Sequence, residues 1–134
     1  MSYAQWIAIK IVSENTTLTI KNARLSWGKF HKEGNKDAEI SPSEINGVEV
    51  RSGESFSIFS CGRSNSASGT RGSFELYDRN IRVGIFDWNS PWGIKRNSFN
   101  WWPDASKDSY LVQIDGGNRD SGAIGNVTIV VLKR

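Results

Sequence analysis

Apolar and polar side chains alternate along most of this chain, and this period of two residues is what most limits its possible folds. In the first segment, Ile7, Ile9 and Ile11 are separated by Ala8 and Lys10. Strict alternation places the three isoleucines on one face of a strand. Helical periodicity is nearly absent, and turn-forming residues recur about every 8 to 12 residues, as in β-sandwiches and barrels. The pattern therefore predicts an all-β protein.

The same pattern predicts about nine mostly antiparallel strands. The isoleucine-bearing strand is expected to form a hairpin with the strand from Thr16 to Leu25, across the turn Ser13-Glu14-Asn15. Further strands are expected at 48–50, 55–61, 73–77, 81–88, 98–102, 109–115 and 123–132.

The segment from Lys29 to Glu39 carries mixed charges and is expected to be a solvated loop, with His31 exposed to water. The segment that follows, Ser41-Pro42-Ser43-Glu44, combines an N-cap residue, a proline at the first helical position and a glutamate at the third. That combination predicts one short helical turn before Asn46-Gly47.

Length and composition favour one soluble domain spanning residues 1–134. The excess of 17 Lys and Arg over 14 Asp and Glu is mild, and acids are interleaved with the bases, so nucleic acid is not an expected partner. Cys61 is the single cysteine and is expected to be a buried structural thiol.

The first residues lack a basic region and a cleavage site, and no apolar run reaches the roughly 20 residues of a membrane-spanning helix. We expect a leaderless protein whose membrane contacts are peripheral.

Four of the six tryptophans lie between Asp87 and Pro103. One of them belongs to the segment Pro91-Trp92-Gly93, which has the residues of a turn, and Lys95 and Arg96 follow at once. Turns run over the surface, so this indole is expected to be exposed. An exposed indole beside cations suits either a boundary between apolar and aqueous phases or a ligand that stacks on the ring.

The other tryptophans divide between interior and surface. Trp88 and Trp101 fall within predicted strands and are expected in the core. Trp6 alternates with the isoleucines of the first strand and therefore points away from their face.

Catalytic and metal-binding patterns are not found. His31 is the single histidine, whereas zinc sites need several ligands and hydrolytic triads need a histidine held by partners. Asp87 lies among tryptophans, where a desolvated acid can act as a general acid, but no second carboxylate is placed near it by sequence. We expect neither an enzyme nor a bound metal or cofactor.

Seven short segments in order resemble those of one family: Tyr3-Ala4-Gln5-Trp6, Ser26-Trp27-Gly28-Lys29, residues 34–39, Cys61-Gly62-Arg63-Ser64, Pro91-Trp92-Gly93, Ser121-Gly122-Ala123-Ile124-Gly125 and Lys133-Arg134. Together they resemble the aegerolysins, small β-sandwich proteins of fungi and bacteria. The resemblance runs from the first strand to the last.

This resemblance implies an actinoporin-like sandwich without the N-terminal helix of actinoporins. It also implies binding to sphingolipids in membranes, either ceramide phosphoethanolamine or sphingomyelin, the latter together with cholesterol. A larger partner of the membrane-attack-complex/perforin type would complete a pore. The protein would be a monomer or weak dimer before it meets a membrane, and would act outside the cell after release by a non-classical route.

The resemblance also assigns lipid-binding residues. The family's site is lined by tryptophans matching Trp6, Trp27 and Trp92 and by a lysine matching Lys95. Arg96 adds a second cation that could hold a lipid phosphate through charge-assisted hydrogen bonds.

The chain departs from the family pattern near that site. Ser68 stands where well-studied fungal members have an acidic residue, and Asp87 stands where members often carry an aromatic one. Asn89-Ser90 replaces a frequent Asp-Cys before Pro91. These changes alter the polarity around a headgroup, so headgroup choice is the property they affect most.

Exposed tryptophans also suit a second interpretation, a carbohydrate-binding module whose indoles stack on sugar rings. Free sugar would release such a protein from its target, whereas a lipid binder would sediment with sphingolipid vesicles.

Overall fold

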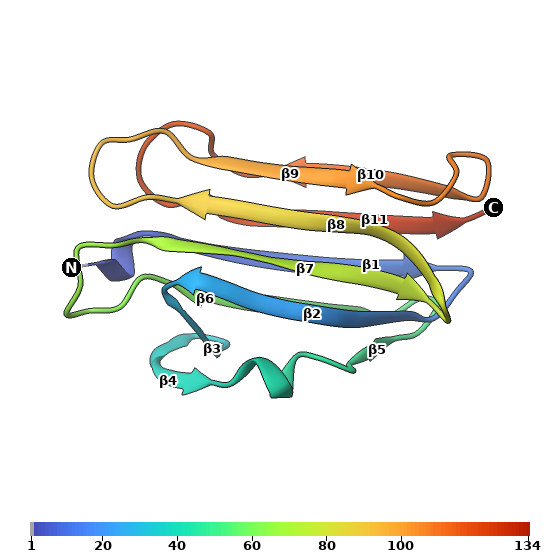
Figure 1. Cartoon of the computed structure of the whole chain (residues 1–134), viewed down its shortest axis with the longest axis horizontal. Helices are drawn as coiled ribbons and strands as arrows, with labels where there is room; N and C mark the ends of the chain where they lie inside the picture. The colour runs from blue at the N-terminus through green and yellow to red at the C-terminus, as the bar shows by residue number, and fades with distance from the viewer. Residues whose placement is uncertain (1) are drawn as a thin grey trace.

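The structure, a computed structural model, describes residues 2–134 as two β-sheets packed face to face (Figure 1). The first sheet has the order β10 (Tyr110–Gly116), β11 (Gly125–Lys133), β1 (Trp6–Glu14), β6 (Ser55–Cys61), β3 (Lys29–Lys32), β4 (Asn35–Ile40). The second has the order β5 (Glu49–Val50), β2 (Leu18–Trp27), β7 (Thr70–Asp78), β8 (Ile81–Ser90), β9 (Ser98–Pro103). The predicted all-β sandwich is confirmed, with two strands more than expected.

Strand pairing is antiparallel except between β1 and β11. These two run parallel, with Ile7 to Glu14 in register with Gly125 to Leu132. On its other side β1 pairs antiparallel with β6. The first strand therefore lies inside its sheet, between two strands that come from much later in the chain.

The predicted hairpin between the first two strands is wrong. The turn after Glu14 crosses from one sheet to the other, so β1 and β2 lie in different sheets instead of pairing at their edges. Ile7, Ile9, Leu18 and Ile20 are all fully buried in that core. Alternation reports which face of a strand is apolar, and that face can be buried equally well by a neighbour opposite it.

The prediction of a solvated loop from Lys29 to Glu39 is also wrong. It forms β3, β4 and the turn between them, and β3 pairs with β6. Phe30 supplies the anchor because its ring is buried and meets the edge of Trp88. His31 is buried rather than exposed, with its ring 5.8 Å from that of Phe59 and its Nδ1 donating to the carbonyl of Lys32.

The predicted helical turn is confirmed as a 3₁₀ turn, η2 (Pro42–Glu44). The backbone N–H of Ser41 donates to the carboxylate of Glu44, as the capping sequence predicted. A second 3₁₀ turn, η1 (Ser2–Ala4), precedes β1.

The core lies between the sheets and is built from the inward residues of alternating strands. Trp88 is buried there, as predicted, and stacks near Phe86 and Phe74. Trp101 is half-buried and packs against the edge of the same core. Cys61 is fully buried and unpaired, which agrees with a structural thiol.

One end of the sandwich is closed by a buried carboxylate. Asp78 accepts hydrogen bonds from Tyr110 and, at 2.9 Å, from Thr16, and forms an ion pair with Lys133 at 2.9 Å. We call this the Asp78 end. It contains the β1–β2 and β7–β8 turns, on the right in Figure 1.

Candidate functional site

The opposite end of the sandwich gathers the tryptophans assigned from sequence. It carries Trp6 at the start of β1, Trp27 at the end of β2, and the loops 62–69, 91–97 and 117–124, on the left in Figure 1. We call it the tryptophan end. Trp6 is in register with Cys61, which is in register with Lys29, so the starts and ends of three strands lie side by side there.

Trp27 faces outward because of the residue after it. Gly28 has φ +94°, and a Cβ on it would lie 2.7 Å from the carbonyl oxygen of Cys61 and 3.0 Å from Thr70. No other residue fits this backbone without displacing its neighbours. The chain can thus bend sharply between β2 and β3 and leave the preceding indole 41% exposed.

A buried chain of hydrogen bonds supports this bend from below. The indole N–H of Trp88 donates to the hydroxyl of Thr70 at 3.0 Å, and that hydroxyl is 2.6 Å from the hydroxyl of Ser60. Ser60 in turn donates to the backbone carbonyl of Lys29 at 2.9 Å. Buried and mutually bonded, these groups hold β8, β7, β6 and β3 in fixed relation beneath the site.

Beside Trp27 lies a pocket of about 410 Å³, which we call the Trp27 pocket. Its lining combines apolar residues with a serine and an ion pair: Leu25, Ser26, Trp27, Gly28, Phe30, Glu39, Ile40, Pro42, Arg63 and Ser68. The guanidinium of Arg63 donates two hydrogen bonds of 2.9 Å to the carboxylate of Glu39. These bonds lower the pKa of Glu39 below its ordinary value, so the carboxylate is charged at neutral pH.

The Trp27 ring also has a cation on its face. The guanidinium of Arg71 lies 5.4 Å from the ring, and the two residues are in register on β2 and β7. The attraction between a cation and the face of a partly solvent-exposed ring helps to hold that ring in one orientation.

The loops 62–69 and 91–97 are brought together by a second glycine. A Cβ on Gly69 would lie 1.7 Å from the carbonyl oxygen of Ser90, so only glycine allows this close approach. Ser68 therefore lies next to the strand end that leads into Pro91 and Trp92.

Loop 91–97 is fixed at its base and projects at its tip. The buried side chain of Asn97 donates to the carbonyls of Asn118 and Gly122, each at 3.0 Å, and the hydroxyl of Ser90 donates to Gly122 at 3.1 Å. These bonds clamp both ends of the loop onto loop 117–124. The tip between them is open, since a Cβ on Gly93 would meet no atom within 4 Å.

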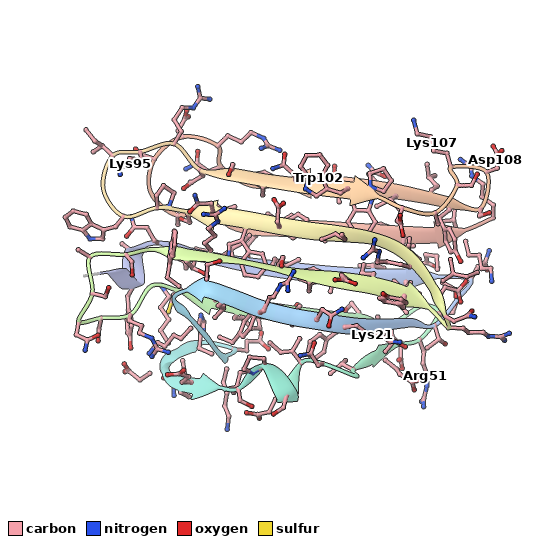
Figure 2. All side chains as sticks on the ribbon, in the orientation of Figure 1. Lys21, Arg51, Lys95, Trp102, Lys107 and Asp108 are labelled. Atoms are coloured by element: carbon pink, nitrogen blue, oxygen red, sulfur yellow. The ribbon has the colours of Figure 1, made fainter. Side chains whose placement is uncertain are left out.

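That tip is apolar at two positions and cationic at the next two. Trp92 is 42% exposed and Ile94 is 95% exposed, followed by the exposed Lys95 and Arg96. Figure 2 shows Lys95 on this loop at the tryptophan end. Among residues 2–134, neither cation has a carboxylate within ion-pair distance. Sequence reasoning missed Ile94, although an isoleucine directly after a Trp-Gly turn is the signal that could have found it.

Trp6 is half-buried and differs in its surroundings. The ammonium of Lys36 lies 5.4 Å from its ring, and the ammonium of Lys29 donates to the hydroxyl of Tyr3 at 2.6 Å. Tyr3 donates onward to Asp37 at 2.8 Å. Trp6 thus contributes a partly exposed ring with a cation on its face to this side of the tryptophan end.

Asp87, which sequence reasoning grouped with the lipid-binding residues, lies apart from these loops. It sits within β8 on the outer face of the five-stranded sheet, in register with Asn100 of β9. Its carboxylate accepts the indole N–H of Trp102 at 2.8 Å and the amide of Asn100 at 3.3 Å.

Two further titratable side chains at this end, His31 and Cys61, are buried. Burial, and to a lesser degree the charges of Lys36 and Lys29, lower the pKa of His31 and keep it neutral at pH 7. Burial raises the pKa of the Cys61 thiol, which disfavours the reactive thiolate. Within the described chain, no group of three or more His, Cys, Asp or Glu side chains is placed to hold a metal ion.

Comparison with known proteins places the chain among sequence relatives of almost the same length. The family described as Aegerolysin matches residues 4–134. Aegerolysin Aa-Pri1 of Cyclocybe aegerita is 43% identical, over 99% of this chain and 93% of that protein. Asp-hemolysin of Aspergillus fumigatus is 42% identical over 97% and 94%, and Ostreolysin A6 of Pleurotus ostreatus is 41% identical over 100% and 99%.

Solved structures agree with these sequence relatives. IP-1A from Alcaligenes faecalis has a TM-score of 0.93 at 44% identity, over 99% of this chain and 94% of that one. RahU, solved in complex with a TRIS molecule, has a TM-score of 0.93 at 40% identity, over 99% and 98%. The fold described above is therefore the fold of these proteins.

Proposed function

The chain belongs to the aegerolysin family, and on that premise we propose that it is a peripheral membrane-lipid-binding protein, related to cytolysins, that recognises sphingolipids through its tryptophan end. Two of its relatives carry the names of lytic proteins, Asp-hemolysin and Ostreolysin A6. The observation that carries the proposal is the projecting tip of loop 91–97, where Trp92 and Ile94 are exposed beside the exposed cations Lys95 and Arg96.

The apolar residues of this end supply the driving force. An indole about two-fifths exposed, such as Trp27 or Trp92, can bury on the order of 100 Å² in the interfacial region, worth roughly 2 to 3 kcal/mol at about 25 cal/mol per Å². Ile94 adds roughly 1 to 2 kcal/mol if most of its side chain leaves water. Ordering of the lipid and the loop offsets part of this gain.

The polar residues supply headgroup recognition. Lys95 and Arg96 are positioned at the tip to donate charge-assisted hydrogen bonds to a lipid phosphate. The Trp27 pocket, with Ser68 and the Arg63–Glu39 pair on its wall, is the place for the rest of the headgroup. We propose that Trp6, Trp27, Ser68, Trp92, Lys95 and Arg96 form this lipid site, and that the headgroup is ceramide phosphoethanolamine or sphingomyelin, the latter together with cholesterol.

Penetration is limited to loop tips. Strands β4, β5, β9 and β10 end their sheets, and their outer backbone groups would lose water without gaining partners if they entered hydrocarbon. No helix within residues 2–134 is long and apolar enough to cross a bilayer. A perforin-like partner would then supply the pore, with this chain as the targeting component.

The test is co-sedimentation with vesicles of phosphatidylcholine alone, or with added sphingomyelin, sphingomyelin and cholesterol, or ceramide phosphoethanolamine. We expect sedimentation only with a sphingolipid. Trp27→Ala and Trp92→Ala should each weaken binding about tenfold or more at an unchanged Tm. Leu111→Ala, which removes an exposed apolar side chain from β10, is the matched control and should bind normally.

Two results would contradict the proposal. Normal binding by both tryptophan variants would place the lipid site elsewhere. Release of a trapped dye from sphingolipid vesicles by this chain alone would remove the need for a separate pore-forming partner.

A further inference from the structure

A groove of about 630 Å³ runs over the outer face of the five-stranded sheet, next to the Trp27 pocket, with which it shares Leu25 and Ser26. It lies across β2, β7, β8 and β9, and its lining includes Arg24, Arg71, Asp87, Asn89, Asn100 and Trp102. Figure 2 shows Trp102 on β9, part-way along the sandwich and away from Lys95 at the tryptophan end. The loop tips that would meet a membrane do not line this groove.

Trp102 forms an exposed flat wall that is held in one orientation. Its side chain is 54% exposed, yet its indole N–H is bonded to the Asp87 carboxylate at 2.8 Å. Asn100 bonds the other carboxylate oxygen, so the carboxylate is itself fixed. A ring that is already ordered loses little entropy when a ligand stacks on it.

The groove contains hydrogen-bonding groups with capacity to spare. The side chain of Asn89 lines the groove beside the Asp87 carboxylate. Asp87 accepts one bond on each oxygen, and a carboxylate can accept about four. The Asp87 carboxylate can therefore accept further hydrogen bonds from ligand hydroxyls.

Two arginines add positive charge beside these groups. Within the described chain, neither Arg24 nor Arg71 has a carboxylate at ion-pair distance. Arg24 has only a long contact of 3.5 Å with the hydroxyl of Ser73, and Arg71 lies over the ring of Trp27. Planar guanidinium groups recognise carboxylates and sulfates through paired hydrogen bonds.

We propose that this groove binds an acidic saccharide. A pyranose ring presents an apolar C–H face that stacks on Trp102, and its hydroxyls reach the Asp87 carboxylate and the Asn89 amide. Its carboxylate or sulfate group meets Arg24 and Arg71. Lipid tails do not fit this surface because its lining is mainly polar. The same sugar chemistry can come from a glycolipid headgroup or from a free polysaccharide.

The test is titration of ¹⁵N-labelled protein with methyl β-D-glucuronide, methyl β-D-glucoside and inorganic phosphate, followed by NMR. We expect the Trp102 indole N–H and the side-chain amides of Asn89 and Asn100 to shift with both sugars. The glucuronide should bind about tenfold more tightly than the glucoside, with a Kd on the order of 1 to 10 mM. Phosphate alone should leave the indole signal in place.

Three variants distinguish the contribution of ring stacking to sugar binding from the contribution of charge. Trp102→Ala, at an exposed position, should fold normally and lose detectable glucuronide binding. Asp87→Asn keeps an oxygen acceptor for the indole and removes a like charge, so it should bind the glucuronide at least as tightly as the wild type. Asp87→Ala frees the indole and should weaken both sugars.

Three outcomes would overturn the proposal: no shift with either sugar, equal shifts in Trp102→Ala, or a phosphate titration that reproduces the glucuronide shifts. Retention of the labelled protein by vesicles containing a glucuronosyl lipid would identify a membrane source. Binding of a glucuronate-containing tetrasaccharide without such retention would identify a free polysaccharide.

Discussion

The two ends of the sandwich use charged and apolar residues in opposite ways. At the Asp78 end, a buried carboxylate has three partners in Tyr110, Thr16 and Lys133. At the tryptophan end, Trp92 and Ile94 are exposed and Lys95 and Arg96 have no carboxylate partner within residues 2–134. Satisfied groups stabilise the folded chain, whereas unsatisfied ones on a fixed loop are available to a ligand. If the proposed function holds, stability and recognition belong to different ends of the sandwich.

The largest expected effect is at the Asp78 end. Asp78→Ala removes a buried acceptor and leaves three donors without their partner, so it should lower the free energy of unfolding by about 2 to 4 kcal/mol. Denaturant unfolding measures this. Asp104→Ala is the matched control, because Asp104 pairs with Arg82 at the surface and should cost no more than about 0.5 kcal/mol. Equal losses in the two variants would remove the distinction between a buried and an exposed pair.

The pH dependence of stability follows from the same group. Burial raises the pKa of Asp78, but the bonds from Tyr110, Lys133 and Thr16 outweigh it and hold the pKa below its ordinary value of 3.8. The stability from Asp78 is therefore fully present above about pH 4 and is lost as pH falls through the lowered pKa. Burial and the Asp78 bond raise the pKa of Tyr110 to about 12, so stability should also fall as pH rises from about 10 to about 12. Asp78→Ala should flatten the acid side of this curve.

The next effect is at the tryptophan end and concerns binding alone. Ile94→Ser should weaken sphingolipid-vesicle binding about fivefold without a change in Tm, because a side chain 95% exposed contributes little to packing within the chain. Ile81→Ser is its counterpart at the Asp78 end, where an isoleucine 48% exposed begins β8. Co-sedimentation should separate the two variants. A similar loss of vesicle binding in both variants would contradict the assignment of binding to the tryptophan end.

A smaller effect is expected from the cations. Lys95→Ala should weaken vesicle binding about threefold at low salt and by less at high salt, because screening already reduces the attraction to phosphate. Lys107→Ala removes a cation from the Asp78 end and should leave binding unchanged (Figure 2). Salt-independent loss in Lys95→Ala would indicate a packing role for the lysine stem.

The smallest effect is expected from the ion pair on the wall of the Trp27 pocket. Arg63 and Glu39 are each about half exposed, so Arg63→Ala should change the free energy of unfolding by no more than about 0.5 kcal/mol. The pKa of Glu39 should rise toward its ordinary value, since its depression comes chiefly from the Arg63 hydrogen bonds. An NMR titration of the Glu39 carboxylate checks this. A pKa that stays low would assign the depression to another group.

The candidate site could be predicted in part. Trp92 in a Pro-Trp-Gly turn and the cations after it were accessible because turn chemistry is local. Ile94 was missed because an apolar side chain also fits the pattern of a buried strand residue, although its position directly after the same turn is a signal of exposure. The pairing of Asp87 with Trp102 depends on the register of β8 with β9, and a sequence does not state that register.

Which faces are apolar, where turns interrupt the strands, and where η2 begins were determined by the sequence alone, since alternation and capping act over a few neighbouring residues. Only the tertiary structure decided that β1 lies between β11 and β6, that Phe30 draws a charged segment into two further strands, and that loops 62–69 and 91–97 meet. The physical reason is that backbone edges are chemically alike in every strand. Partners are therefore chosen by how the whole set of side chains packs, and that choice is made across the full length of the chain.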